Sequence, residues 1–164
     1  MITPGQITGE TIKSPIALKI REHFKQVNGE VITYPSIYKE QTVKDFDKPS
    51  FFIWTMDVNW NKVGKNRYEG LYQMNIRFHP EDEDENKYET LCQIGTELCD
   101  CLETINVPIS TDGKTETVLP VRGTDMEYKI LDDILQFYVN YTLKAKRPIT
   151  EIKMETLTTN TTTK

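Results

Sequence analysis

The sequence lacks a basic cluster, a long apolar run and an apolar N-terminal core, and each absence excludes a class of protein. Its 20 Lys and Arg are outnumbered by 25 Asp and Glu, which gives a net charge of −5. A protein that binds nucleic acid through its phosphates needs clustered Lys and Arg, so sequence-specific nucleic-acid binding is not expected. Nothing approaches the roughly 18 consecutive apolar residues of a membrane span, and residues 1–13 lack the apolar core of a signal peptide. We therefore expect no membrane partner and a protein that stays in the cytoplasm where it is made.

Side chains that could form a reactive site are also scarce. The three cysteines, Cys92, Cys99 and Cys101, are too close and too few for a disulfide framework, so we expect reduced thiols beside a helix's packed face. His79 followed by the acidic run 81–85 is the best metal candidate, but the alternating ligands and turn glycine of a calcium loop are missing. No nucleophile elbow and no glycine-rich phosphate loop occur. The sequence predicts no catalytic residue, no metal and no cofactor.

The charge is unevenly distributed along the chain. Residues 81–103 contain nine acidic residues and one lysine, a net charge of −8, so within a total of −5 the remainder carries +3. A solvated acidic helix face is the first interpretation. The alternative is a bipolar subunit that stacks in register with copies of itself.

The first third of the chain is predicted to contain an arm, a helix and a short strand. Residues 1–13 have no periodicity and are expected to be extended. Ser14 and Pro15 are typical of a helix start, and apolar residues then follow at three- and four-residue steps as far as Val27. Asn28-Gly29 is expected to end this helix through a left-handed cap. A strand at Val31–Tyr34 and a loop at Ser36–Lys48 follow.

Two antiparallel hairpins are predicted in the rest of the chain, separated by a second helix. In the first, strands within Phe51–Phe78 flank a turn at Asn59–Asn66, and the second strand alternates between apolar and polar residues. A helix with one apolar stripe then extends to Ile105. The sequence further indicates a loop at 106–117, a short strand at Val118–Val121, a turn at Arg122–Met126, and a hairpin of Met126–Leu131 and Ile134–Ala145 that turns at Asp132-Asp133.

This order of elements predicts an α+β fold. We expect one twisted, mainly antiparallel sheet of two hairpins plus short strands, with two amphipathic helices packed on one face. At 164 residues the chain suits one domain. The predicted organisation is an N-terminal arm at 1–13, a domain at 14–147 and a Thr-rich extension at 148–164, whose β-branched residues suit addition to a neighbour's sheet edge.

The candidate functional residues are therefore interface residues. Trp60 is predicted near a polar hairpin tip, where it would either anchor a partner or fold back onto its own domain. The tip 58–66, the loop 106–117 and the extension 148–164 are the candidate contact segments. The individual candidates are Trp60, Asn61, Lys62, Val63, Lys65, Asp112, Lys114, Thr158, Thr159 and Thr161.

Several segments, taken in order, resemble the phage tail terminator family of tailed phages, prophages and phage-tail-like bacteriocins of Gram-positive bacteria. The similar segments are Pro49–Ile53, Tyr72–Pro80, the helix 86–105, Arg122–Ile130 and the aromatic strand Leu135–Tyr141. Together the similarity runs from about residue 14 to 146. The sequence has Asp132-Asp133 where relatives commonly carry Asp-Gly, and the Thr-rich extension is not part of the pattern.

The resemblance implies a non-enzymatic virion protein that forms a ring, typically a hexamer. Such a ring would sit on the last ring of tail-tube subunits, stop tube growth and face a neck or collar protein, or cap a headless particle. The tail tube protein is the implied partner, with the sheath protein as a further one in a contractile tail. The family has no catalytic residues to transfer to this chain.

Two other functions stay open from the sequence. The first keeps a role in virion assembly, as a neck or head-completion protein or a tail-assembly chaperone. The second is a small metal-dependent hydrolase that would use His79 and the acidic run 81–85. Phage and headless bacteriocin, and contractile and non-contractile tails, are not distinguished.

Overall fold

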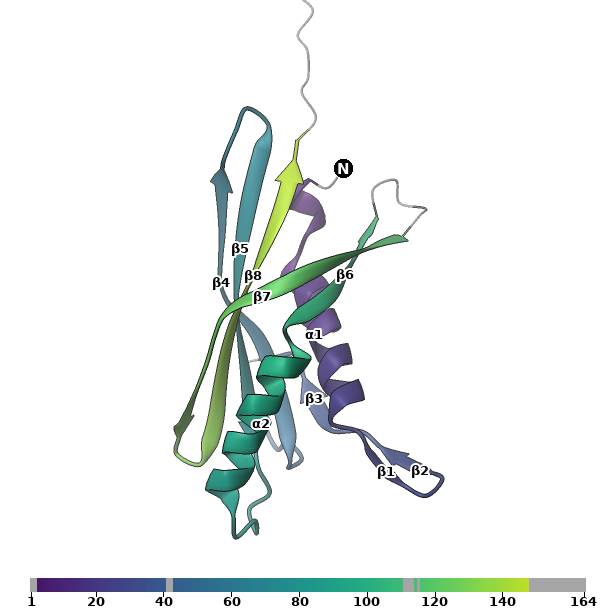
Figure 1. Cartoon of the computed structure of the whole chain (residues 1–164), viewed down its shortest axis with the longest axis vertical. Coiled ribbons are helices and arrows are strands. Elements are labelled where there is room, and N and C mark those ends of the chain that lie inside the picture. Colours follow the sequence, from purple (N-terminus) through teal and green to yellow (C-terminus); the bar gives the residue numbers. More distant parts are fainter. Residues whose placement is uncertain (1–2, 41–42, 111–113, 115, 148–164) are drawn as a thin grey trace, which may run out of the picture.

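The computed structural model describes residues 3–40, 43–110, 114 and 116–147. It is an α+β structure in which two helices lie against a curled, mostly antiparallel sheet (Figure 1). The elements in chain order are η1 Pro4–Gln6, α1 Gly9–His23, β1 Gln26–Asn28, β2 Val31–Thr33, β3 Ser36–Tyr38, β4 Ser50–Lys62, β5 Arg67–His79, α2 Lys87–Cys101, β6 Thr104–Ser110, β7 Glu116–Leu131 and β8 Ile134–Lys146.

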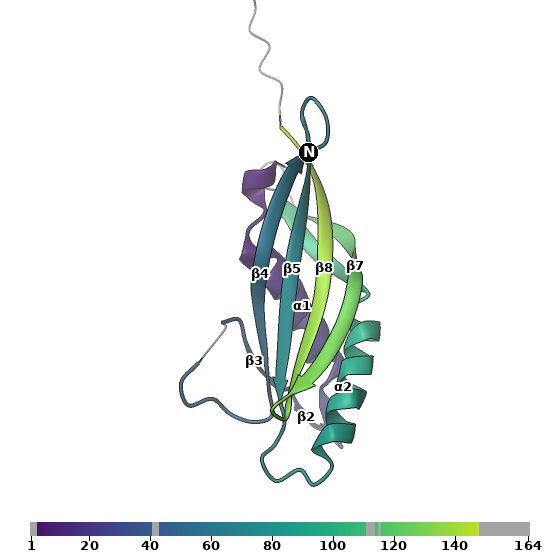
Figure 2. The same ribbon diagram turned by 90° about the vertical axis from the view of Figure 1, so that its left-hand side faces the viewer.

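The main sheet has six strands in the order β3-β4-β5-β8-β7-β6. Only β3 and β4 are parallel, and the other neighbours pair antiparallel. Both helices lie on one face of the sheet, while Figure 2 shows the opposite face of β4, β5, β8 and β7 with no helix over it. The predicted fold class is confirmed.

Alternation along the strands places the core between the sheet and the helices. Apart from the half-buried Tyr68, the apolar residues of β5 and β8 that the sequence predicts to share a face are buried, among them Tyr72, Ile76, Phe137 and Tyr141. Two core tyrosines also find acceptors for their hydroxyl groups. Tyr72 donates to the carbonyl of Ile7 at 3.1 Å, and Tyr141 donates to that of Leu102 at 2.8 Å. A buried hydroxyl without a partner is costly. These two bonds satisfy the tyrosine hydroxyls and connect the residues next to α1 and α2 to the sheet.

Both predicted hairpins are confirmed, although residues 59–62, predicted as part of the first turn, belong to β4. Strands β4 and β5 pair over their whole lengths, with a bulge between Thr55 and Asp57. Strands β7 and β8 turn at Asp132 and Asp133, whose φ angles are 52° and 59°. A two-residue turn with both φ angles positive matches the twist of a hairpin, and aspartate tolerates that conformation better than most residues.

The first helix differs from its prediction at both ends. It begins at Gly9 rather than at Ser14, because Thr8 caps it: the Thr8 hydroxyl accepts from the Thr11 N–H at 3.3 Å. Pro15 lies inside the helix with its ring buried. The helix ends at His23, and Val27 belongs to β1.

Asn28-Gly29 therefore does not cap the helix. It leads into a tight hairpin in which Asn28 pairs with Val31 and Gly29 has a φ of 65°. Gly29 and Glu30 are the two central residues of this turn, and a glycine at the first central position is a hairpin signal. The predicted strand at Val31–Tyr34 is present as β2, and the predicted loop at Ser36–Lys48 contains the short strand β3.

The second helix and the loop after it were also predicted with the wrong limits. Helix α2 ends at Cys101, and residues 104–110 of the predicted helix end and loop form β6. Ile105, Val107 and Ile109 are buried at alternate positions, so their spacing belongs to a strand. The predicted strand Val118–Val121 is part of β7. The predicted turn at Arg122–Met126 is instead a bulge in β7, where Asp125 has a φ of 51°.

Candidate interaction surface

The tip of the β4–β5 hairpin is exposed at one end of the molecule (Figure 1). Cα pairing continues to Asn61–Glu69 and Lys62–Tyr68, and the Val63 N–H closes the turn by donating to the Arg67 carbonyl at 2.9 Å. Of the candidate residues, Asn61, Lys62, Val63 and Lys65 are all exposed here. The sequence therefore located a protruding tip correctly, while the contact role of these residues stays a prediction.

Trp60 packs against its own domain. Its ring covers Gly70 so closely that a Cβ at Gly70 would lie 2.5 Å from the indole. The ring also meets Tyr72 edge-on, with centroids 6.1 Å apart. This corresponds to the second of the two roles considered for Trp60, whose side chain is half-buried.

The end of β8 lies beside the hairpin tip. Arg147 donates its N–H to the Asn66 carbonyl at 2.9 Å, and Asn66 Nδ2 donates to the Arg147 carbonyl at 3.2 Å. The Arg147 guanidinium also lies over the Tyr68 ring, 4.9 Å from its centroid. No local sequence pattern predicts that residues 62–67 and 144–147 lie side by side. These two segments together contain four lysines.

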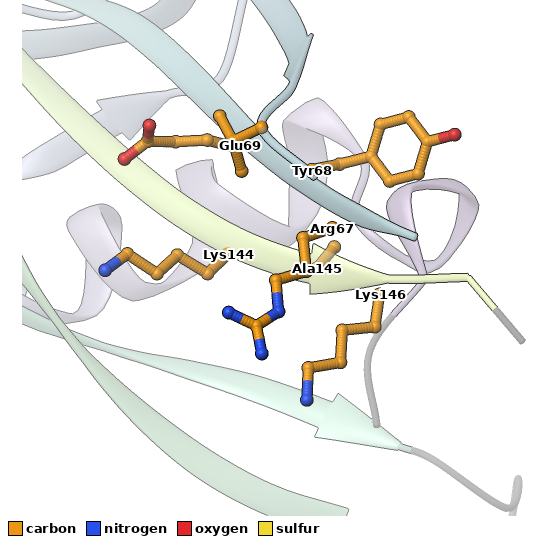
Figure 3. Close-up of a pocket in the computed structure, with 7 residues that line it drawn as sticks. Arg67, Tyr68, Glu69, Lys144, Ala145 and Lys146 are labelled. Atoms are coloured by element: carbon orange, nitrogen blue, oxygen red, sulfur yellow. The ribbon is translucent and has the colours of Figure 1, made fainter. Parts of the chain in front are cut away.

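Together these segments form a basic end. We define the basic end as the exposed residues Lys62, Lys65, Arg67, Lys144, Lys146 and Arg147. Cross-strand pairing places Arg67 beside Lys146 and Glu69 beside Lys144. Figure 3 shows the side chains of Arg67, Lys144 and Lys146 around a depression of about 550 Å³ that Glu69 also lines.

The opposite end of the molecule is acidic. We define the acidic end as the residues before and within the start of α2 and the β7–β8 turn, which lie together at the bottom of Figure 1. Two lysines are close in sequence or space: Lys87, and Lys48, which pairs with Asp82 at 2.7 Å. The acidic residues are Glu81, Asp82, Glu83, Asp84, Glu85, Glu89, Asp132 and Asp133.

Two aspartates at this end, Asp82 and Asp84, bind neighbouring groups of the same subunit. The hydrogen bond and charge of Lys48 lower the pKa of Asp82. Asp84 accepts from the Asn86 N–H at 2.9 Å and from the Thr90 hydroxyl at 2.8 Å, which secures the start of α2. The positive end of the α2 dipole also stabilises carboxylates near the start of the helix. The predicted acidic helix start is thus present.

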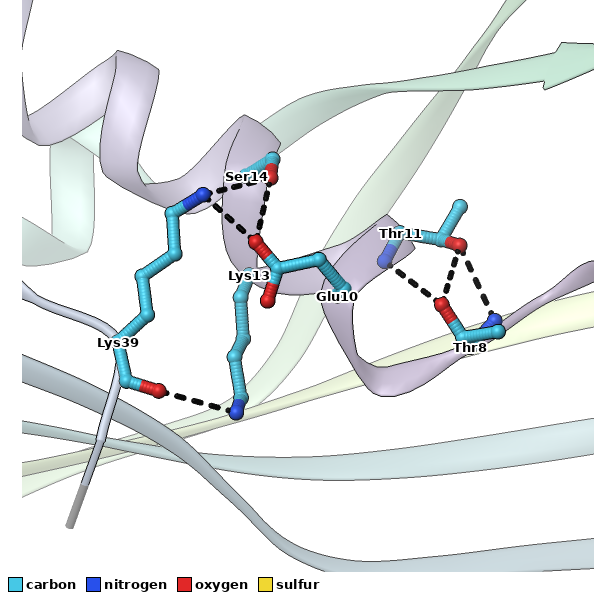
Figure 4. Close-up of polar contacts among 6 residues, drawn as sticks. All are labelled: Thr8, Glu10, Thr11, Lys13, Ser14 and Lys39. Atoms are coloured by element: carbon cyan, nitrogen blue, oxygen red, sulfur yellow. Dashed lines mark hydrogen bonds and ion pairs between the residues drawn. The ribbon is translucent and has the colours of Figure 1, made fainter.

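The N-terminal segment is tied to the domain over its described residues. Lys39 Nζ contacts Glu10 at 2.7 Å and Ser14 Oγ at 2.8 Å, while Lys13 Nζ donates to the Lys39 carbonyl at 3.1 Å (Figure 4). The hydrogen bond from Lys39 lowers the pKa of Glu10. Residues 3–13 contain η1 and the start of α1 rather than an extended arm.

The residues with reactive chemistry are placed in structural surroundings. His79 lies 4.7 Å from the Phe46 ring centroid and 5.2 Å from that of Phe52. Its pKa is lowered by burial first, and then by the charges of Arg77 and Lys48. Burial raises the pKa of Cys101 to about 12, which disfavours its thiolate. Across the described ranges, no three His, Cys, Asp or Glu side chains form a group that could hold a metal ion.

The remaining candidates lie around the β6–β7 connection and the C-terminus. Lys114 is exposed. Asp112, Thr158, Thr159 and Thr161 lie outside the described residues, so their contact role stays a prediction.

The chain was compared with protein families and with curated proteins. A family model described as phage tail terminator protein matches residues 11–153 of the chain. No curated protein matches it. Of the helices in the described part, none is long and apolar enough to cross a membrane.

Proposed function

The chain belongs to the phage tail terminator family, and from this membership we propose that it forms a closed ring that caps the tail tube and stops its elongation. A tail terminator is a structural component of a virion or phage-tail-like particle, not an enzyme. The observation that carries the proposal is the extent of the family match, which includes α1 from its third residue, α2 and the strands β1 to β8.

The ring is the arrangement that suits a single small domain at the end of a tube. Closed cyclic symmetry, which the family resemblance implies to be six-fold, lets one copy contact two neighbours through different surfaces without open-ended growth. Strand β4 offers an edge for such a contact. Among the described residues only 50–52 of β4 pair with β3 on that side, and Met56 and Val58 are 52% and 41% exposed.

We assign the tail tube protein as the principal partner, contacted through the hairpin tip 61–65. On the other side, the ring would face a neck or collar protein, and a sheath protein if the tail contracts. Assembly would take place in the bacterial host's cytoplasm. The extension 148–164, which follows Arg147 of the basic end in the sequence, would reach a neighbouring subunit or the sheath.

Electron microscopy of particles made with and without this protein tests the proposal. We expect tubes of uncontrolled length in its absence, and the protein at one end of the tube in mature particles. Tails of normal length in its absence would contradict the proposed function. Its absence from mature particles would instead indicate a tail-assembly chaperone.

A further inference from the structure

We propose that the basic end is the docking surface for a carboxylate-rich surface of the tail tube's terminal ring. This inference rests on the proposed function and adds to it the chemistry of the contact. It also assigns four residues that the hairpin tip alone does not contain, Arg67, Lys144, Lys146 and Arg147.

The backbone segments that carry the basic end are joined to one another. They are the end of β4, the β4–β5 turn, the start of β5 and the end of β8, and the Asn66–Arg147 hydrogen bonds at 2.9 and 3.2 Å connect the turn to the end of β8. The Arg147 side chain is further positioned over Tyr68. A partner would thus meet charges that are already arranged, which reduces the ordering cost of binding.

Among the described residues, the charges of the basic end have no ion-pair partner. All six ion pairs in these ranges lie elsewhere. Glu69 is the one carboxylate among the residues that line its depression. Six exposed cations at one end repel one another, and an acidic partner surface would relieve that repulsion.

The acidic end gives this contact a direction. A carboxylate-rich surface would be attracted by the basic end and repelled by the acidic end, since like charges brought together oppose binding. Because the two ends lie at opposite extremes of the long axis (Figures 1 and 2), every subunit of a ring would be oriented in the same sense. This explains how a terminator could seat on a tube with one face only.

Apolar side chains at the basic end favour a protein partner over nucleic acid. Val63 is 57% exposed at the tip, and Tyr68 is half-buried beside it. Glu69 and the chain's net charge of −5 would both repel phosphates. A protein surface can match apolar and charged groups together.

Co-sedimentation with purified tubes tests this inference. The probe is tail tubes purified from cells that lack this protein, mixed with the full-length chain at increasing NaCl concentration. The variant Lys144→Glu/Lys146→Glu reverses two charges at exposed positions. Its control, Lys44→Glu/Lys129→Glu, makes the same change in net charge at exposed positions away from the basic end. Circular dichroism and thermal unfolding verify that each variant is folded.

We expect the wild type to bind tubes with an affinity that falls as salt rises. The basic-end variant should bind at least roughly tenfold more weakly, and the control within about twofold of wild type. Equal binding by wild type and the basic-end variant would overturn the inference while leaving tube capping intact. If tubes of uncontrolled length form without the protein but purified tubes do not bind it, docking through the tube end is wrong. Tight binding of a 30-base-pair DNA that competes with tubes would reassign the basic end to nucleic acid.

Discussion

Close contacts between glycines and aromatic rings determine how the layers of this domain approach each other. Gly95 of α2 lies against Tyr128 of β7, and a Cβ there would be 2.8 Å from the tyrosine ring. Within the sheet, Gly70 of β5 leaves room for the ring of its cross-strand partner Trp60. At this scale the residues matter through the space they leave, which a sequence alone does not reveal.

Gly95→Ala should destabilise the domain, although alanine is the better helix former. The gain in helix propensity of about 1 kcal/mol is outweighed by an overpacking cost of roughly 1–3 kcal/mol. Urea unfolding would measure the difference. Gly5→Ala is the control, because a Cβ there has nothing within 4 Å. A rise in stability for Gly95→Ala would show that α2 and β7 are less tightly packed than described.

His79 should make stability depend on pH. Because burial and nearby cations lower its pKa in the folded state, the unfolded chain binds more protons when the pH lies between the folded value and about 6.5. The contribution of neutral His79 to the free energy of unfolding is fully present above about pH 6.5, and it is lost as the pH falls through the folded-state pKa.

Unfolding free energies between pH 5 and 7 would test this effect. His79→Gln should flatten the profile, whereas His23→Gln, which changes the other histidine of the chain, should retain it. An unchanged slope in His79→Gln would assign the dependence to another group.

At the scale of elements, the limits of the helices depend on caps and competing pairings. Helix α1 begins where Thr8 and Thr11 cap each other: the Thr8 N–H donates to Thr11 Oγ1 at 3.0 Å, and the Thr8 hydroxyl accepts in return. The Ser14-Pro15 pair resembled a start as strongly as this one. The apolar spacing at Leu102 and Ile105 is compatible with a helix, but Ile105 lies in β6 because residues 104–110 pair with β7.

The cap of α1 predicts opposite sensitivities at two hydroxyl residues. Thr8→Ala removes the acceptor for the Thr11 N–H and should cost about 1 kcal/mol of unfolding free energy. Ser14→Ala removes an exposed hydrogen bond to Glu10 and a part-buried one from Lys39, and should cost less than about 0.5 kcal/mol. Thermal and urea unfolding of both variants compare the two starts. A larger loss of unfolding free energy for Ser14→Ala than for Thr8→Ala would indicate that the helix begins at Ser14, as the sequence predicts.

At the scale of the whole molecule, the main feature is the separation of charge between its two ends. The acidic end comes mostly from one contiguous run, whereas the basic end comes from the end of β4, the β4–β5 turn, β5, β8 and Arg147. A ring of such subunits would have faces of opposite charge, which suits a protein that has to be placed between two different partners.

Removal of residues 148–164 should leave the domain intact and weaken its attachment to particles. The Asn66–Arg147 bonds remain in a chain that ends at Arg147, so stability should change by no more than about 0.5 kcal/mol. The amount of protein that copurifies with tails measures attachment.

A second truncation locates the effect within the extension. A chain that ends at Leu157 lacks Thr158, Thr159 and Thr161 and tests these candidates directly. If both truncated chains join tails at the wild-type level, the extension has no role in attachment.

The sequence by itself determined the alternating strands, both hairpin turns, the two amphipathic helices and the order of segments typical of the family. These features are local, because backbone periodicity and turn conformation depend on residues a few positions apart. Only the tertiary structure decided where the helices end, that Trp60 folds onto Gly70, and that Arg67 lies beside Lys146. Those outcomes depend on which strands pair and which surfaces pack, and the pairing of β5 with β8 joins segments that no local pattern connects.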